Sequence, residues 1–321
     1  MTGSIVYANN SGLGTLAREF YDNNILDKVL VTTNNRYRDF YERFSGGRVY
    51  SKENLEWLLE GLDTLIFFET PFDDEIIPMA KKRGIKTILM PMYECTRFEA
   101  YNPDLWLAVS NLDEQWLKER DLKYVRINVP VNTKRVKWKL RETAQHFIHN
   151  AGHGGVGGRN GTQELIEAMK SVYSPIRLTI NSQANDFDIK DDRITFKRAN
   201  YLNYWDMWHE GDVFIFPERF NGLSLPIQEA FASGMMIMCT NREPFNEWLP
   251  TDPMIDPIGH NIVRIANEVR AAIISPENIA KSIDLWADRS IKEFSLLGKE
   301  WAKENSWEKL GPKYKEICTK H

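Results

Sequence analysis

The chain has 321 residues, of which 42% are hydrophobic and 27% charged, as is typical of a folded protein long enough for two domains. Its formal net charge of −4 argues against a non-specific nucleic-acid binder, although it leaves room for a local basic patch. There is no run of about 18 uncharged apolar residues and no signal-peptide pattern, and the three cysteines are widely spaced. We therefore expect no membrane span and a cytoplasmic location.

The N-terminal half alternates short apolar runs with helical patterns. Continuous apolar strands separated by amphipathic helices are typical of a parallel sheet that is covered on both faces. The charged and weakly periodic stretch 129–145 then predicts a connection between domains. Strands are predicted at 4–9, 28–33, 63–69, 85–93, 104–110 and 124–129, with helices after the first strand, near 73–83 and near 111–121.

A second series of the same kind follows the connection. Together the two series predict an α/β protein with two Rossmann-like, doubly wound domains, at residues 1–138 and 139–299. Ligands of such sheets bind beyond the carboxyl ends of the strands, so two facing edges would form one cleft. Strands are predicted at 146–152, 176–181, 193–197, 212–217 and 235–240, helices at 162–173, 200–209 and 226–233, and helical structure again from about 277.

The most informative segment, FPERFNGLSLPIQEAFASGMMIMCT (216–240), runs from one predicted strand to the next. Pro226 is tolerated in the first turn of the intervening helix, and Gly234 is expected to end that helix in the left-handed conformation. Glu229 points away from the apolar stripe, so a carboxylate lies near helix N-terminal amides that can hold a phosphate. We expect Glu229 to bind a ribose diol; a solvated glutamate is the alternative. The amides belong to Gly222, Leu223, Ser224 and Leu225.

This segment resembles the signature that binds the sugar nucleotide in family 4 glycosyltransferases, which have the GT-B fold. The family pattern is a Glu, seven residues and a second Glu, and N-G-L-S-L-P-I-Q-E-A-F-A-S-G (221–234) fits it. The resemblance implies that Glu229 binds the ribose hydroxyls and that Asn221 takes the first Glu position, near the transferred sugar. An Asn can hydrogen-bond a hydroxyl but brings no negative charge.

A Gly-rich loop, HNAGHGGVGGRNG (149–161), lies between a predicted strand and a predicted helix, where the backbone can approach a phosphate closely. In the family, the equivalent loop holds the diphosphate with an Arg and a Lys. Gly155 and Asn160 occupy those two positions here, and Arg159 is the candidate replacement. Asn160 with Gln163 also resembles a helix capping pair.

Further candidate cations and acids follow other strands. Lys197 and Arg198 come just after a predicted strand and can supplement Arg159. The segment with Gly12 and Gly14, after the first predicted strand, resembles the family's first loop, which lies against the donor phosphates and the acceptor. An ordinary tight turn is the alternative. Glu69 and Glu94 each end a strand, so their carboxylates are candidates for the acceptor side of the reaction, with solvated loop residues as the alternative.

The resemblance covers most of the chain and implies that the C-terminal helix (300–321) packs back on the first domain. It also implies transfer of a sugar from a UDP- or GDP-linked donor with retention. The catalytic candidates are Glu94, Glu69 and Arg159. No Asp-x-Asp cluster suggests a bound divalent cation, and the histidines show no zinc-type spacing, so we expect no metal and no cofactor besides the sugar nucleotide.

Two classes of acceptor stay open: a glycan, lipid or small molecule, and a hydroxymethylated DNA base. The second is included because related enzymes occur in phages and can glycosylate such bases. A phage-encoded enzyme would act in the host cytoplasm. The segment 34–52 mixes basic and aromatic residues, which suits nucleic acid but is also typical of a solvated helix face. A nucleotide-sugar epimerase and a non-catalytic sugar-nucleotide or glycan binder are the alternative functions. The basic residues of the segment are Arg36, Arg38, Arg43, Arg48 and Lys52.

Overall fold

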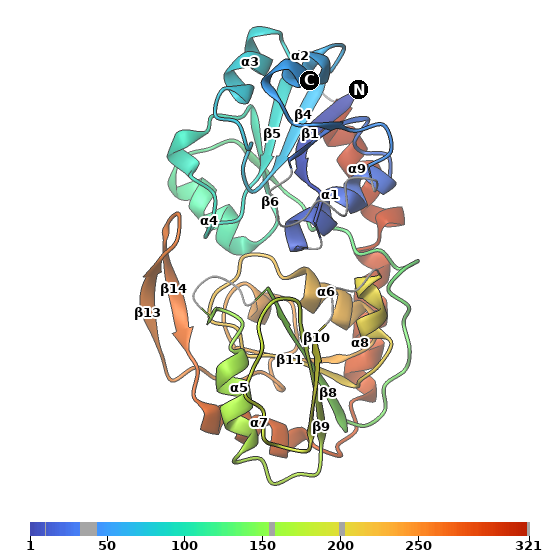
Figure 1. Ribbon diagram of the computed structural model, residues 1–321, viewed down its shortest axis with the longest axis vertical. Coiled ribbons are helices and arrows are strands. Elements are labelled where there is room, and N and C mark those ends of the chain that lie inside the picture. Colours follow the sequence, from blue (N-terminus) through green and yellow to red (C-terminus); the bar gives the residue numbers. More distant parts are fainter. Residues whose placement is uncertain (10, 33–43, 154–157, 199–202, 320–321) are drawn as a thin grey trace. The chain divides into compact units, whose positions relative to one another are not determined.

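The computed structural model describes residues 1–9, 11–32, 44–153, 158–198 and 203–319, and these form two compact units (Figure 1). The N-terminal unit comprises Met1–Pro130, Ile265–Asn267 and Trp307–His321. The C-terminal unit comprises Val131–Arg264 and Glu268–Ser306. Each unit is built on its own parallel sheet, as two successive α/β series predict.

The sheet of the N-terminal unit has seven strands in the order β3-β2-β1-β4-β5-β6-β7, all parallel. Its central strands are buried along nearly all of their length, because they carry apolar runs such as TLIFF and the TILM of β5. The strands are β1 (Thr2–Tyr7), β2 (Lys28–Thr32), β3 (Arg48–Val49), β4 (Thr64–Phe68), β5 (Lys86–Met90), β6 (Leu105–Ala108) and β7 (Tyr124–Arg126).

Serine side chains begin three helices of this unit. Ser11, Ser51 and Ser110 each accept a hydrogen bond from the backbone N–H three residues on, which fixes where each helix begins. The helices are α1 (Gly12–Asp22), α2 (Lys52–Leu59), α3 (Ile76–Lys82), α4 (Asn111–Glu119) and α9 (Trp307–Thr319), with a short 3₁₀ turn, η2, at Phe98–Ala100.

The end of the chain, α9, packs on the N-terminal sheet (Figure 1). Thr64, which begins β4, donates its hydroxyl to the Cys318 carbonyl at 2.6 Å. Phe20 of α1 meets the rings of Trp307 and Tyr314 edge-on, with centroids 5.1 and 4.9 Å apart. Aromatic residues from α1 and α9 therefore close one face of this sheet.

The sheet of the C-terminal unit has five parallel strands in the order β10-β9-β8-β11-β12. Side chains alternate between its faces: Val213 and Ile215 join one apolar cluster, and Phe214 and Phe216 join the other. Its strands are β8 (His146–Gly152), β9 (Arg177–Ser182), β10 (Ile194–Arg198), β11 (Val213–Phe216) and β12 (Met236–Cys239).

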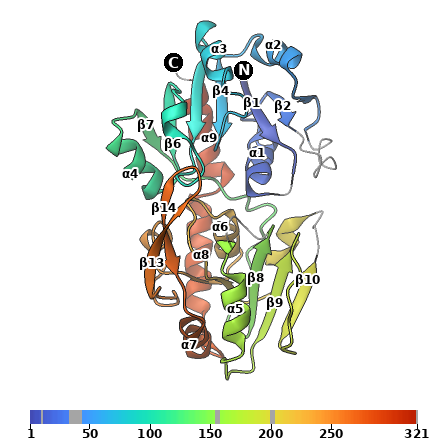
Figure 2. The same cartoon turned by 60° about the vertical axis from the view of Figure 1, so that its left-hand side comes forward.

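Helices cover both faces of this sheet, so it is doubly wound. α5 and α7 pack against each other in the first cluster (Figure 2), while α6 and α8 pack together and contribute to the second. The elements are α5 (Thr162–Met169), α6 (Leu225–Ala232), α7 (Pro276–Trp286), α8 (Lys292–Glu304), the 3₁₀ turns η4 (Tyr204–Trp208) and η5 (Phe245–Glu247), and an antiparallel hairpin of β13 (Gly259–Arg264) and β14 (Glu268–Ile273).

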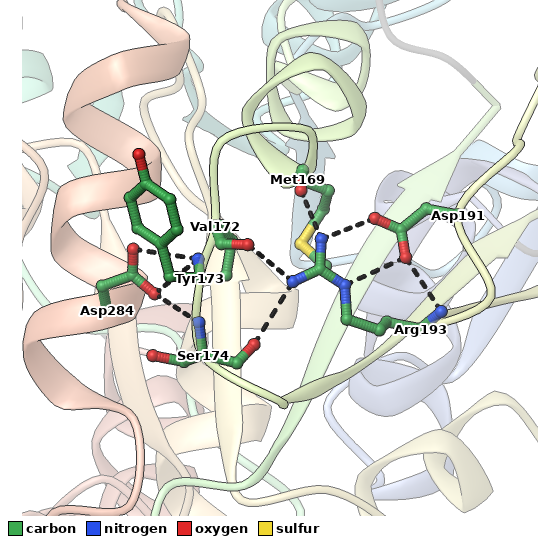
Figure 3. Close-up of polar contacts among 7 residues, drawn as sticks. All are labelled: Met169, Val172, Tyr173, Ser174, Asp191, Arg193 and Asp284. Atoms are coloured by element: carbon green, nitrogen blue, oxygen red, sulfur yellow. Dashed lines mark hydrogen bonds and ion pairs between the residues drawn. The ribbon is translucent and has the colours of Figure 1, made fainter.

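A polar network ends α5 at Met169, four residues earlier than the sequence predicts (Figure 3). The guanidinium of Arg193 donates to the carbonyls of Met169, Val172 (2.7 Å) and Ser174 (3.3 Å). The carboxylate of Asp191 orients that guanidinium at 2.7 and 3.0 Å. The last carbonyls of a helix have no partner within it, so this side chain takes the place of another helical turn.

Other differences from the predicted elements are local. The helix predicted at 200–209 is the 3₁₀ turn η4 in its described part. The short strand β3, helix α2 and the β13–β14 hairpin were not predicted. Within the described residues, none of the helices is long and apolar enough to cross a bilayer.

Candidate functional site

The loop between β11 and α6 is formed as the sequence predicts. Ser224 caps the helix by accepting from the Ile227 amide at 3.4 Å, and Pro226 lies in the first turn. Gly234 follows the helix with φ of 93°, and a Cβ there would lie 2.3 Å from the Lys139 carbonyl oxygen, so only glycine fits.

Glu229 lies within α6 and is buried, with 8% of its surface exposed, which rules out the solvated alternative. The Tyr204 hydroxyl donates to one carboxylate oxygen, and the Trp208 indole N–H donates to the other at 3.1 Å. Both donors come from η4. These two hydrogen bonds fix the orientation of the Glu229 carboxylate.

A buried ion pair that the sequence analysis missed lies beside this loop. Glu218 is fully buried, and Nη1 of Arg242 lies 3.2 Å from each of its carboxylate oxygens. The same guanidinium approaches the carbonyl of Asn221 at 3.4 Å, and Thr240 donates to the Glu218 carbonyl at 2.6 Å. Charged residues directly after β11 and β12 were the available signal, since both follow carboxyl ends of neighbouring strands.

Asn221 and Gly222 are both buried at this carboxyl-end edge, with Asn221 8% exposed. The ion pair and the cap thus hold both ends of the segment 218–224. Of the predicted amides, those of Gly222, Leu223 and Ser224 lie in this held loop, and that of Leu225 begins α6.

The Gly-rich loop packs directly on the loop after β11. A Cβ at Gly161, whose φ is 67°, would come within 1.9 Å of the Pro217 carbonyl oxygen. The predicted capping pair is wrong: Gly161 is the cap residue of α5, and the Asn160 side chain instead donates to the Ala151 carbonyl at 2.9 Å. The Asn160 side chain therefore ties the loop to β8 through this hydrogen bond. Gly155 lies outside the described residues.

Two arginines meet where these loops touch. The amide of Arg219 donates to the Arg159 carbonyl at 2.7 Å, so the two residues belong to adjacent loops of one sheet edge. Arg159 was predicted and Arg219 was not. The Arg219 carbonyl accepts from the Ala272 amide at 2.7 Å, which attaches β14 to the same loop.

Lys197 and Arg198 are the last two residues of the edge strand β10, which β9 separates from β8. Lys197 pairs with Glu210 at 3.1 Å, and Arg198 pairs with Asp186. All four side chains are substantially exposed. The structure engages both cations in surface ion pairs and does not bring them to the loops at 158–161 and 218–224.

His149 links three elements of this unit from a fully buried position. Its Nδ1 lies 2.9 Å from the Ile215 carbonyl oxygen and its Nε2 lies 2.8 Å from the Thr162 hydroxyl. Burial lowers the pKa of His149 to about 4, so the ring is neutral, with Nδ1 as donor to the carbonyl. His149 is therefore structural and joins β8, β11 and α5.

In the N-terminal unit, the first loop is tight at one of the two predicted glycines. A Cβ at Gly14 would lie 2.3 Å from the Asn9 carbonyl oxygen, whereas none of the described residues comes within 4 Å of a Cβ at Gly12. The Asn9 side chain accepts from the amide and hydroxyl of Ser11 at 3.1 and 2.6 Å. Gly14 is therefore required by close packing, and Gly12 borders open space.

Glu69 directly follows β4 in the left-handed region, with φ of 65°. Its carbonyl accepts from the Thr96 hydroxyl at 2.8 Å, which joins it to the loop after β5. Desolvation and the Glu69 charge both raise the pKa of Tyr7, which ends β1. The ends of β1 and β4 thus bring Tyr7 and Glu69 together.

Glu94 is buried, with 3% exposed, and a fully buried second acid, Asp113 of α4, lies close enough to feel its charge. Asp113 accepts from the Tyr93 amide at 3.0 Å and the Ser110 hydroxyl at 2.6 Å. Burial first, and then the Glu94 charge, raise the pKa of Asp113 to about 7, although Arg126 opposes the shift. Sequence reasoning missed Asp113, which reads as an ordinary first-turn acid of a capped helix.

The basic–aromatic segment is only partly described: Arg36, Arg38 and Arg43 lie outside the described residues. The guanidinium of Arg48 lies 4.4 Å from the centre of the Trp57 ring. Lys52 begins α2 and pairs with the carboxylate of Asp73 at 2.7 Å. These two cations make contacts within the protein.

Comparison with known proteins gives structural likeness only. No protein-family model matches the sequence, and no curated protein matches it. A glycosyltransferase from Rickettsia africae aligns over 100% of this chain and 99% of its own at a TM-score of 0.73 and 14% identity. Anabaena HepE in complex with UDP and glucose aligns over 99% of both chains, at a TM-score of 0.68 and 8% identity. A sucrose-phosphate synthase from Thermosynechococcus elongatus aligns over 98% of both chains, at a TM-score of 0.65 and 13% identity.

These alignments cover both units, and together with the two doubly wound parallel sheets they confirm the predicted GT-B fold class. At such low identity the likeness carries the fold and not the activity. Function has to be argued from the polar groups at the two sheet edges.

Proposed function

We propose that this chain is a glycosyltransferase that takes its sugar from a nucleoside diphosphate sugar, bound at the carboxyl-end edge of the C-terminal sheet. The observation that carries the proposal is Glu229: a buried carboxylate within α6, oriented by Tyr204 and Trp208. Its carboxylate is the acceptor that we assign to the two ribose hydroxyls. The fold shared with glycosyltransferases supports the same assignment.

The family 4 pattern at 221–234 supports a retaining enzyme of that type, and the UDP bound to Anabaena HepE favours a UDP-linked sugar. Asn221 meets a hydroxyl of the transferred sugar through its amide. The leaving diphosphate gains negative charge, which the amides of 222–225 and the Arg159 guanidinium stabilise without a metal ion. Arg219, one loop away, joins this edge through its backbone, while its guanidinium donates to the Ala272 carbonyl at 3.4 Å.

The acceptor hydroxyl binds at the carboxyl-end edge of the N-terminal sheet, where Glu69 and Glu94 are the candidate groups for receiving its proton. The acceptor classes are a glycan or small molecule and a hydroxymethylated DNA base of phage type. Asn221, in place of the family glutamate, favours one alternative function, a sugar-nucleotide binder without turnover. An epimerase would change the sugar with no acceptor present.

The test begins with thermal stabilisation by UDP-, GDP- and ADP-sugars, since a ligand at 100 times its dissociation constant stabilises by about 2.7 kcal/mol. Glu229→Ala should weaken binding of the stabilising sugar nucleotide by about 1–3 kcal/mol. Glu229→Gln is the matched variant, because it keeps the shape of the side chain and disturbs the hydrogen bonds to η4 less than Ala does. Unchanged affinity in both variants by calorimetry removes Glu229 from the site.

Nucleotide release assays then separate the functions. Release that requires a glycan or hydroxymethylated DNA establishes transfer and its acceptor class. Binding without release in any mixture supports the non-catalytic alternative, and an altered sugar without acceptor supports epimerisation. Binding of none of the sugar nucleotides overturns all three.

A further inference from the structure

A cavity of about 570 Å³ lies in the N-terminal unit, at the edge opposite to the one that carries Glu69 and Glu94. Lys86 begins β5, Leu105 begins β6, and Lys123 directly precedes β7, so the cavity opens at the amino ends of three adjacent strands. Ile317 of α9 forms another wall. Its volume is within the range of small-molecule sites, which is about 300–1,000 Å³.

The polar lining of this cavity is strongly basic. Lys81, Lys86 and Lys123 supply three ammonium groups against one carboxylate, that of Asp104, which leaves a formal charge of +2. The Asp104 carboxylate already accepts from the amide and hydroxyl of Thr87, each at 2.8 Å, and pairs with Lys81 at 3.2 Å. Asp104, the one acid among the described lining residues, is therefore engaged with Thr87 and Lys81.

Lys86 and Lys123 lie close enough to repel one another. Desolvation lowers the pKa of Lys86, and the charge of Lys123 lowers it further, while Asp104 acts in the opposite sense. Lys86 donates to the Ile317 carbonyl at 2.8 Å, so its ammonium group is held at the cavity wall. An anion between the two lysines would remove this repulsion.

The rest of the lining is aliphatic, from Ile85, Leu105, Val125 and Ile317. Val125 is 37% exposed, so apolar surface faces solvent next to the ammonium groups. An inorganic anion would pair with the ammonium groups but leave the aliphatic surface exposed to water. A ligand with an anionic head and an apolar part covers both.

We propose that the basic cavity bounded by Lys81, Lys86, Lys123 and Ile317 binds an amphiphile with a phosphate head group. The phosphate lies between the ammonium groups of Lys86 and Lys123, and the apolar part lies on Leu105, Val125 and Ile317. A lipid in a bilayer and a free phosphorylated amphiphile offer the same chemistry. The site is separate from the sugar-nucleotide edge and does not depend on the function proposed above.

Binding is measured on the full chain with three probes: inorganic phosphate, short-chain soluble dihexanoyl phosphatidic acid, and phosphatidylcholine vesicles with and without phosphatidic acid. Dihexanoyl phosphatidic acid should bind more tightly than inorganic phosphate, and added salt should weaken binding. Additional retention on vesicles that contain phosphatidic acid identifies a bilayer lipid as the source. Binding of the soluble probe without vesicle retention identifies a free amphiphile.

Lys123→Gln should weaken binding of dihexanoyl phosphatidic acid roughly tenfold, the scale of one charge-assisted contact. Lys82→Gln is the matched control, because Lys82 is exposed, neighbours Lys81 and lies outside the cavity lining. Both residues are exposed, so neither variant should unfold the chain. Equal losses in the two variants, equal affinity for inorganic phosphate and the amphiphile, or no binding to any phosphatidic acid probe would overturn the proposal.

Discussion

The acids at the carboxyl-end edges of the two sheets are held in different ways. In the C-terminal unit, Glu218 lies against the Arg242 guanidinium and Glu229 accepts from a phenol and an indole. In the N-terminal unit, Asp113 is buried in the field of Glu94, and its pKa is raised to about 7. The first edge thus offers fixed acceptors for hydroxyl groups, whereas the second holds a proton that exchanges near neutral pH.

The largest effect is expected from removing the cation of the first edge. Arg242→Met leaves Glu218 buried without its guanidinium, so the free energy of unfolding should fall by about 3–5 kcal/mol in urea denaturation. The double variant Glu218→Gln, Arg242→Met removes both charges and should lose less. Equal losses in the single and double variants would show that the pair matters only through packing.

Two glycine positions, one at each edge, test whether close packing against a backbone oxygen decides the cost of adding a Cβ. Gly161→Ala places a Cβ 1.9 Å from the Pro217 carbonyl oxygen at positive φ, and should cost about 1–3 kcal/mol of stability, with weaker sugar-nucleotide binding. Gly12→Ala meets open space and should stay within about 0.5 kcal/mol of the wild type. Thermal denaturation checks both, and similar values for the two variants would contradict the difference between the loops.

The last effect concerns the second edge and appears as pH dependence. Asp113 titrates near its ordinary 3.8 when unfolded and near 7 when folded, so between these values the folded chain binds more protons. The free energy of unfolding therefore falls as pH rises through this window, by at most about 1.4 kcal/mol per pH unit from this group.

Asp113→Asn removes that titration while keeping an acceptor for the Tyr93 amide. The stability of the variant relative to the wild type should rise between pH 4 and 7 and stay level above pH 7. Chemical denaturation over a pH series measures the difference. A constant difference across the series would show that Asp113 is ionised throughout.

Local patterns were enough for the fold. Continuous apolar runs predicted the strands of both sheets except the short β3, and Pro226 and Gly234 marked the beginning and end of α6 because each acts through its own backbone. The β13–β14 hairpin escaped prediction because β13, GHNIVR, is exposed along most of its length and has no buried face to generate alternation.

The candidate site was only partly predictable. The sequence placed Asn221 and Glu229, but their partners come from distant segments: Tyr204 is 25 residues from Glu229, and Arg242 is 24 from Glu218. A pattern within one helix or loop carries no information on such pairs. For the same reason Asn160 was predicted as a cap, although its amide group reaches back to β8.

The turn after α5 has a practical use. Tyr173 takes part in it through its backbone amide, which donates to Asp284 at 3.1 Å, while its side chain is 93% exposed (Figure 3). The turn precedes β9 and so lies at the amino-end edge of its sheet, away from Glu229. With Cys239 and Cys318 buried, Tyr173→Cys in a Cys95→Ser background gives one reactive thiol. A fluorophore or surface linker attached there would report on this protein while leaving the edge that carries Glu229 untouched.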